Sequence, residues 1–258
     1  MDTARYASPN CKTCHGRGYV RNGEGINDYA VCSCAILGQR REAAELTLER
    51  ALPPRAREMT FRSFETGGLA QNERALLAAR NFVRNYRTAR DQGWVLGLWG
   101  APRTGKTHLA LAIAQACTKR YLARPMLLNV PKALRAERER FNDPSKPSLF
   151  EQAAGVDLLI LDDLGAQYER QATDTTRVSW VSEQLYSLLD ERVLNNRPLI
   201  YTTNLSPSDL ERRLSNEQGQ RILGRLKEAE VAALEVLAVP GLRNDTKQAA
   251  GDLLFAED

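Results

Sequence analysis

The sequence predicts an α/β fold, in which helices cover both faces of a parallel five-stranded sheet, with a small cysteine-rich module in front of it. Short apolar runs alternate with helical stretches from residue 94 onwards, which is typical of parallel sheets. A glycine-rich loop joins the first run to the helix that follows it. Four of the five cysteines lie within the first 34 residues. We therefore expect two parts, residues 1–52 and 53–258, divided at Pro53 and Pro54.

The apolar runs that predict strands are short and are bounded by turn residues. They cover residues 94–99, 125–130, 156–165, 198–204 and 231–239. Amphipathic or charged stretches predict helices over residues 39–52, 72–90, 107–123, 132–141 and 177–196. The first of these helices is expected to link the cysteine-rich module to the sheet.

The composition is that of an ordinary globular protein, with 43% hydrophobic and 26% charged residues. A net charge of +4 is compatible with a polyanionic partner but does not predict one. The sequence has no apolar run long enough to span a membrane, and its first residues do not resemble an export signal. We expect a cytoplasmic protein, in a bacterial cell or the cytoplasm of a viral host, with no membrane partner.

The glycine-rich loop matches G-x-x-x-x-G-K-[ST] between a strand and a helix, the context that this phosphate-binding motif requires. Backbone amides of the loop and the helix N-terminus would bind the β-phosphate, the lysine would reach the β and γ oxygens, and the threonine would bind Mg²⁺. A plain glycine turn is the alternative. The predicted ATP-binding residues are Gly100, Ala101, Pro102, Arg103, Thr104, Gly105, Lys106, Thr107 and His108.

Two carboxylates follow the third apolar run, at the end where open α/β sheets bind their ligands. We expect Asp162 to hold Mg²⁺ together with Thr107, and Asp163 to orient and deprotonate the attacking water. Asn204, after the fourth run, is expected to contact the γ-phosphate or that water. A helix cap or a turn residue fits the same position.

The cysteines Cys11, Cys14, Cys32 and Cys34 form a C-x-x-C pair and a C-x-C pair, which suit a tetrahedral Zn²⁺ site. A segment with so little apolar material needs such a cross-link to fold. His15 is a substitute ligand in a variant of this interpretation. A disulfide pair or free thiols are the alternatives.

These motifs, in this order, resemble those of the AAA+ ATPases, and more closely those of the DnaC/DnaI helicase loaders and the related IstB transposition helpers. The most specific parts are "GAPRTGKTHLALAIA", "VDLLILDDLGAQ", "RPLIYTTNLS" and "QRILGRLKE". The resemblance implies a P-loop NTPase core with a reduced lid, which places a hexameric replicative helicase on single-stranded DNA. It implies that Phe61 or Phe64 contacts the adenine; core positions are the alternative for both. Many members have glutamate where this chain has Asp163, so slow hydrolysis, stimulated by assembly or DNA, is expected.

The resemblance also implies roles for three arginines. Arg225 corresponds to a finger that reaches the ATP of a neighbouring subunit, and Arg221 lies beside it on the same helix face. The alternative is a solvated face near Glu228 and Glu230. Arg243 resembles a second sensor of the γ-phosphate, or else it is an exposed turn residue. A finger in trans makes hydrolysis depend on self-assembly into a ring or helical oligomer.

Two regions are expected to contact single-stranded DNA, because they line the pore side of family assemblies. The stretch "ALRAERERFND" offers Arg138 and Phe141, and the loop "AQYERQ" offers Tyr168 and Arg170. A charged helix face and a surface loop are the alternatives.

The N-terminal module separates the two related groups. Loaders of the DnaI kind carry a zinc-bearing adaptor that grips the helicase, and transposition helpers generally have none. We therefore expect an ATP-dependent helicase loader of DNA replication, whose residues 1–52 bind the helicase. A transposition helper is the first alternative. A module that binds single-stranded DNA or a partner under ATP control, with incidental hydrolysis, is the second.

Overall fold

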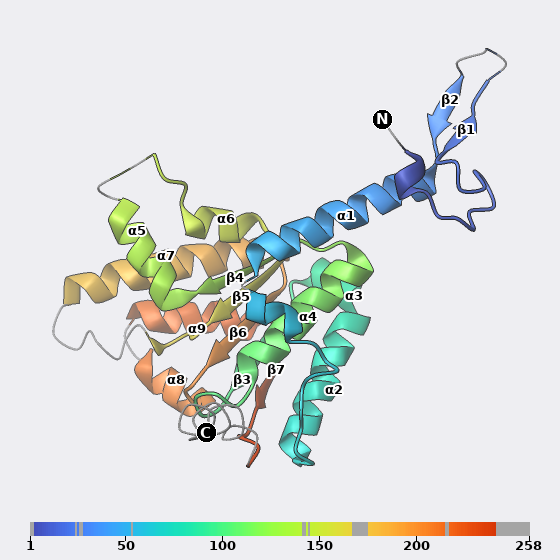
Figure 1. Cartoon of the computed structure of the whole chain (residues 1–258). Helices are drawn as coiled ribbons and strands as arrows, with labels where there is room; N and C mark the ends of the chain where they lie inside the picture. Colours follow the sequence, from blue (N-terminus) through green and yellow to red (C-terminus); the bar gives the residue numbers. More distant parts are fainter. Residues whose placement is uncertain are drawn as a thin grey trace, which may run out of the picture.

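The computed structural model describes residues 3–23, 25, 28–52, 54–140, 143, 145–166, 175–214 and 217–240. A five-stranded sheet with helices around it forms the larger part of the molecule (Figure 1). A small module lies apart from this body, at the far end of the long helix α1 (Ser33–Ala51). No helix among the described residues is both long and apolar enough to cross a membrane.

All strands of the five-stranded sheet run parallel, in the order β4-β5-β6-β3-β7. The strands are β3 (Val95–Trp99), β4 (Pro125–Asn129), β5 (Leu158–Asp162), β6 (Leu199–Thr203) and β7 (Glu230–Glu235). The predicted parallel five-stranded α/β fold is therefore confirmed. Since parallel strands all end at the same edge, the residues after β3, β4, β5 and β6 come together there.

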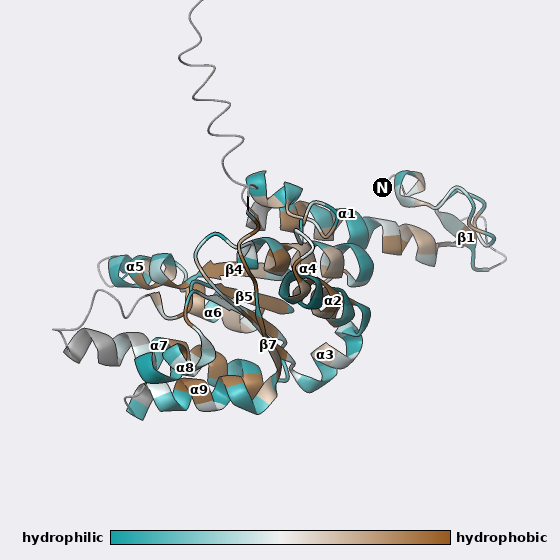
Figure 2. Cartoon of the chain, turned by 90° about the horizontal axis from the view of Figure 1, so that it is seen from below, coloured by the Kyte–Doolittle hydropathy of each residue, from teal (hydrophilic) through white to brown (hydrophobic). Residues whose placement is uncertain are grey.

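Both faces of the sheet are buried, because successive side chains of a strand point to opposite sides. In β5, Leu158 and Ile160 join one hydrophobic cluster, and Leu159 and Leu161 join the other. Figure 2 shows the apolar strands between helices that carry hydrophilic residues. The first cluster is completed by α1, α2 (Ala70–Arg84), α3 (Tyr86–Gln92) and α4 (Lys106–Tyr121). The second is completed by α5 (Val130–Arg140), α6 (Leu149–Gly155), α7 (Thr175–Leu194), α8 (Pro207–Arg213) and α9 (Glu217–Ala229).

The predicted boundaries of three elements differ most from the structure. The helix expected over residues 72–90 is two helices, because the backbone at Asn85 leaves the helical conformation and its side-chain amide donates to the carbonyl of Asn81. Helix α1 begins at Ser33 rather than residue 39, since its first turn packs into the cysteine-rich module. Strand β7 ends at Glu235 because Leu237 hydrogen-bonds to the side chain of Asn72 instead of a strand.

The N-terminal module is built from short elements. It contains a 3₁₀ turn η1 (Ala4–Tyr6) and an antiparallel hairpin of β1 (Tyr19–Arg21) and β2 (Tyr29–Val31). Gly18 has a φ of +79°, and a Cβ atom there would lie 2.4 Å from the carbonyl oxygen of Thr3. Only glycine therefore lets η1 pack against the start of the hairpin. After α1, a second 3₁₀ turn η2 (Pro54–Glu58) leads to α2.

Candidate functional site

The glycine-rich loop connects the carboxyl end of β3 to the first turn of α4, as predicted. Gly100 has a φ of +139°, and a Cβ atom there would lie 2.3 Å from the carbonyl oxygen of Val236. Gly105 has a φ of +100° and immediately precedes the helix. Both conformations are accessible to glycine and strained for other residues. The loop thus brings its backbone close to the strands while the N-terminus of α4 points to the open edge of the sheet.

Lys106 is the first residue of α4, and its side chain is only 5% exposed. Its ammonium group donates to the carbonyl oxygens of Gly100 at 2.9 Å and Ala101 at 2.7 Å. Thr104 also donates to the carbonyl of Ala101, at 3.1 Å. The lysine charge is therefore held within the loop, where it is positioned to meet an anionic ligand.

Thr107 and Asp162 are in direct contact although 55 residues separate them. The Thr107 hydroxyl donates to Asp162 Oδ1 at 2.7 Å, and Thr202 donates to the same oxygen at 2.9 Å. The side-chain amide of Asn129 donates to the other carboxylate oxygen of Asp162 at 3.3 Å. The hydroxyl and carboxylate that the sequence predicted as Mg²⁺ ligands thus meet at the sheet edge.

Asp163 follows the end of β5 in the left-handed conformation, with a φ of 59°. Its backbone amide donates to Thr202 Oγ1 at 3.1 Å, and its carboxylate accepts from Asn129 Nδ2 at 3.0 Å. Burial and the neighbouring charge of Asp162 raise the pKa of the Asp163 carboxyl above its ordinary value. A raised pKa makes this carboxylate a stronger base than an exposed aspartate.

Asn129 and Thr202 are functional candidates that the sequence reasoning missed. Asn129 ends β4, and Thr202 is the last but one residue of β6. Together they hydrogen-bond to Asp162 and Asp163 and hold both residues in place. The available signal was a polar residue at the carboxyl end of an apolar run, in "PMLLN" and "LIYTT". On one sequence that signal does not differ from an ordinary strand end.

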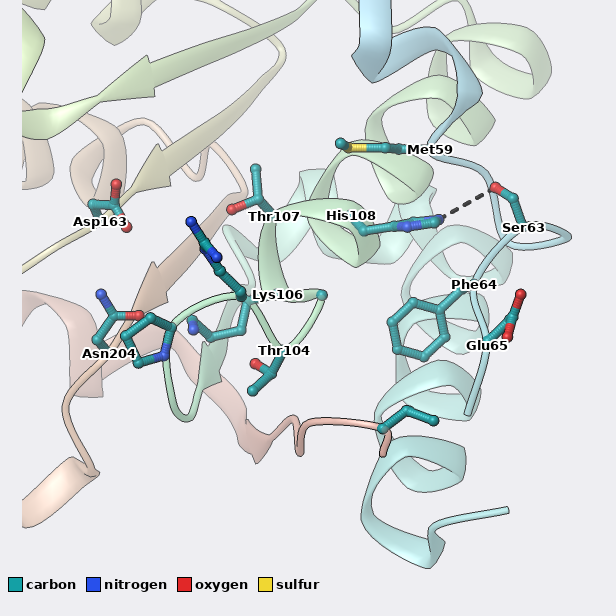
Figure 3. A pocket seen from close by; sticks show the side chains of 14 residues that line it. Met59, Ser63, Phe64, Glu65, Thr104, Lys106, Thr107, His108, Asp163 and Asn204 are labelled. Carbon is teal, nitrogen blue, oxygen red and sulfur yellow. Dashed lines mark hydrogen bonds between the residues drawn. The ribbon is translucent and has the colours of Figure 1, made fainter. Parts of the chain in front are cut away.

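A pocket of about 520 Å³ joins the loop to the carboxylate edge. Figure 3 shows Lys106 and Thr107 between two ends, one formed by Asp163 and Asn204 and the other by Phe64 and His108. The Phe64 and His108 rings meet edge to face, with centroids 5.4 Å apart. The pocket is lined by Met59, Ser63, Phe64, Glu65, Pro102, Arg103, Thr104, Gly105, Lys106, Thr107, His108, Asp163, Asn204 and Val239.

The pocket therefore has a polar end and a partly apolar end. Of the two aromatic candidates, Phe64 lines it, whereas Phe61 packs against the hydrophobic core. Asn204 reaches the polar end together with Asp163. Arg243 lies outside the described residues.

Arg225 lies on α9, outside the lining of this pocket. Its guanidinium pairs with Asp190 of α7 at 2.5 Å and with Glu228 at 2.9 Å. Arg221 lies over the ring of Tyr186, with 3.9 Å from its Cζ to the ring centroid. Within one chain these two arginines join α9 to α7. The solvated-face alternative placed the arginines near Glu228 and Glu230, and of these Glu228 pairs with Arg225.

Arg138 is the one predicted DNA contact within the described part of the chain. It lies on α5, with its Cζ 5.7 Å from the ring centroid of Trp180 on α7. Phe141, Tyr168 and Arg170 lie outside the described residues.

The four cysteines of the N-terminal module come together as predicted, with all their sulfur atoms within 4.8 Å of one another. The sulfurs of Cys11 and Cys32 are 3.8 Å apart, and those of Cys14 and Cys34 are 3.4 Å apart. Tetrahedral ligands at a Zn–S distance of about 2.3 Å lie about 3.8 Å from one another, so the set fits zinc. Backbone amides of Cys14 and Thr13 lower the pKa of the Cys11 thiol to about 6, which favours the thiolate that binds metals there. Despite a backbone hydrogen bond with Ser8 that lowers it, burial and the neighbouring cysteine sulfurs raise the pKa of Cys34 to about 12.

A phosphate loop, paired carboxylates and a parallel sheet of this order define a class of nucleotide-binding protein. The model of the ATPase family associated with various cellular activities (AAA) matches residues 96–226. The chain therefore belongs to the AAA family of ATPases. The family supports ATPase activity in general, with ATP as the nucleotide and Mg²⁺ as its usual companion.

Some proteins similar to the chain carry names from DNA replication. The chain is 28% identical to the phage-like element PBSX protein XkdC of Bacillus subtilis, over 82% of this chain and 76% of that protein. It is 26% identical to the replicative helicase loader DnaI of Bacillus subtilis, over 54% of this chain but only 42% of that protein. A putative primosome component from Streptococcus pyogenes has a similar structure, with a TM-score of 0.59 and 26% identity over 76% of this chain and 97% of that one.

Proposed function

We propose that this chain is an ATPase that loads a hexameric replicative helicase onto single-stranded DNA. The observation that carries the proposal is the combination of one site and one module. The Thr107–Asp162 contact beside the phosphate loop fits Mg²⁺ and ATP, and the four-cysteine module fits a zinc-bearing adaptor. Helicase loaders among the relatives support this choice. A cytoplasmic location, bacterial or in the host of a virus, follows from it.

The residues of the pocket would divide the work along its length. The loop amides and Lys106 would bind the phosphates, Thr107 and Asp162 would hold Mg²⁺, and Phe64 would contact the base. Bound Mg²⁺ would neutralise charge on the phosphate oxygens. Asp163 would accept the proton of the attacking water, and Asn129 would keep its carboxylate aimed at the phosphate end of the pocket. Asn204 would contact the γ-phosphate or that water.

Asp163→Asn is expected to lower ATP turnover by roughly 10²–10⁴-fold, because it removes the proton acceptor. The affinity for ATP should be retained, since the amide leaves the loop intact. Steady-state hydrolysis and ATP binding are measured on the same preparation. Asp91→Asn, an exposed position on α3, is the control. Undiminished hydrolysis by the Asp163 variant would exclude it as the base.

Arg225 would act on the ATP of a neighbouring subunit in a ring or helical oligomer, after leaving Asp190 and Glu228. Arg225→Ala is then expected to lower the turnover of assemblies by up to about 10³-fold. Asp190→Asn removes the same ion pair but keeps the guanidinium, so it should retain turnover.

Mixing two inactive variants tests the action in trans directly. Lys106→Ala subunits would lack bound ATP yet supply the finger, and Arg225→Ala subunits would bind ATP yet lack the finger. A mixture should regain part of the activity. If the mixture stays as inactive as its components, Arg225 does not act across a subunit interface.

Co-purification tests the proposed partner. The full-length chain with zinc and ATP is expected to retain a hexameric replicative helicase and to promote its binding to single-stranded DNA. Capture of a transposase on duplex DNA instead, without helicase binding, would favour a transposition helper.

Arg138, with Phe141, Tyr168 and Arg170, is proposed to contact the single strand. Arg138→Ala should therefore weaken the binding of single-stranded DNA.

A further inference from the structure

The segment between α1 and α2 lies between the N-terminal module and the pocket. We call residues 56–64 the link segment. At its end it carries Met59, Ser63 and Phe64 into the pocket lining. It begins within η2, which comes shortly after α1, and α1 begins in the cysteine-rich module and carries Cys34 in its first turn. One short stretch of chain therefore forms a wall of the pocket and is joined to the helix that carries the N-terminal module.

Two polar side chains of α4 fasten the link segment to the body. His108 Nε2 lies 2.8 Å from the carbonyl oxygen of Thr60, and the amide of Gln115 donates to the carbonyls of Ala56 at 2.8 Å and Met59 at 2.7 Å. The two residues are seven positions apart, so they lie on one face of the helix. Gln115 is a buried amide in the otherwise apolar run "LALAIAQAC", and both of its hydrogens are used.

The link segment is stiff within itself. The Ser63 hydroxyl donates to the carbonyl of Glu58 at 2.5 Å, and Thr60 and Ser63 exchange backbone-to-hydroxyl bonds of 3.0 and 3.2 Å. The ring of Phe64 is 8% exposed and lies against Gly105, where a Cβ atom would be 2.9 Å from the ring. A molecule that contacts Phe64 therefore contacts a turn that is held by several hydrogen bonds.

The other end of the link segment is bonded to α1. The Arg57 guanidinium donates to the carbonyl of Glu49 in the last turn of the helix, at 3.2 Å. Leu48 of α1 and Leu52, which caps its C-terminal end, are buried in the same hydrophobic cluster as Ala56 and Phe64. The end of α1 therefore packs on the same group of side chains as the base end of the pocket.

We propose that the link segment couples the base end of the nucleotide pocket, the end formed by Phe64 and His108, to the last turn of α1. His108 and Gln115 are the positioning residues of this link. This inference rests on the proposed binding of ATP in that pocket. Occupation of the base end tightens the link segment and slows local opening at the last turn of α1. Coupling between two sites is reciprocal. A partner held by the N-terminal module therefore changes the affinity for ATP by the same factor by which ATP changes the affinity for that partner.

Hydrogen exchange on the full-length zinc-loaded chain tests the coupling. Saturating Mg²⁺ with ATP is expected to slow amide exchange at residues 48–52 by about fivefold or more, the lower end of the usual range of coupling between sites. Inorganic tripolyphosphate fills the phosphate end without a base, and it should leave these amides unchanged. Both ligands are first shown to bind by calorimetry.

Gln115→Met has a similar shape but cannot donate, and it should reduce the ATP effect at residues 48–52 to less than about twofold. Thr118→Val is the matched control, because it removes buried hydroxyl bonds from the same helix without touching the link segment. Arg57→Ala is an exposed second variant that cuts the link at α1 and should act like Gln115→Met.

The outcomes separate this inference from the proposed function. A wild-type chain that binds no ATP overturns both. If ATP binds while exchange at residues 48–52 stays unchanged, the coupling is wrong and the proposed function stands. Full protection by ATP in both Gln115→Met and Arg57→Ala likewise contradicts the link segment as its route.

Discussion

Lys106→Ala is expected to abolish detectable ATP binding, with an affinity at least about 100-fold lower than that of the natural chain. Hydrogen bonds from a charged group to phosphate contribute about 1.5–3 kcal/mol each, and the lysine would donate to two phosphates. Its ammonium is already held at the loop by Gly100 and Ala101, so little ordering is needed on binding. Calorimetric titration with Mg²⁺ and ATP measures the loss.

Lys119→Ala is the matched control for this prediction. It removes an exposed lysine from the last turn of the same helix, and its affinity for ATP should equal that of the natural chain. The Lys106→Ala variant should keep its zinc content and its helical circular dichroism. Retained affinity for ATP in a folded Lys106→Ala chain would contradict the assignment of this loop as the phosphate-binding site.

Removal of zinc is expected to unfold the N-terminal module and leave the sheet domain folded. Among its described residues the module has few buried side chains besides Cys14 and Cys32, and structural zinc supplies about 10–16 kcal/mol of apparent binding free energy in small domains. Cys14→Ser should have the same effect, because Cys14 is completely buried and is one of the four clustered cysteines. Limited proteolysis with and without a chelator measures the loss, as cleavage within residues 1–35.

Cys117→Ala is the control for the cysteine prediction. Cys117 lies on α4 in the hydrophobic core, and burial raises the pKa of its thiol well above the ordinary value. This variant should bind as much zinc as the natural chain. A module that resists proteolysis in the reduced state with no metal bound would contradict the zinc assignment.

The chemistry of the phosphate end of the pocket could be predicted because short sequence motifs specify its residues. A loop of fixed spacing precedes a helix, and "LLILDD" places its carboxylates at the end of a buried strand. Parallel strands then bring the loop and the carboxylates to one edge, which gives the Thr107–Asp162 contact. The cysteine cluster was predictable for the same reason, since ligand spacing limits which side chains can meet.

The remaining features depend on contacts between distant segments. Asn129 looks like any polar strand end until β4 and β5 are placed side by side. Gln115 looks like an imperfection in an apolar helix until the carbonyls of Ala56 and Met59 are placed against it. The break at Asn85 depends on one hydrogen bond that competes with helix propensity. The pairing of Arg225 with Asp190 joins two helices whose packing no local pattern specifies.

A crystal structure of the chain with Mg²⁺ and a non-hydrolysable ATP analogue would show whether this pocket holds the nucleotide. We expect the triphosphate along the loop, with Lys106 on its oxygens, the metal beside Thr107 and Asp162, and the base against Phe64. An analogue bound elsewhere on the chain, or a pocket that stays empty at saturating concentration, would contradict it.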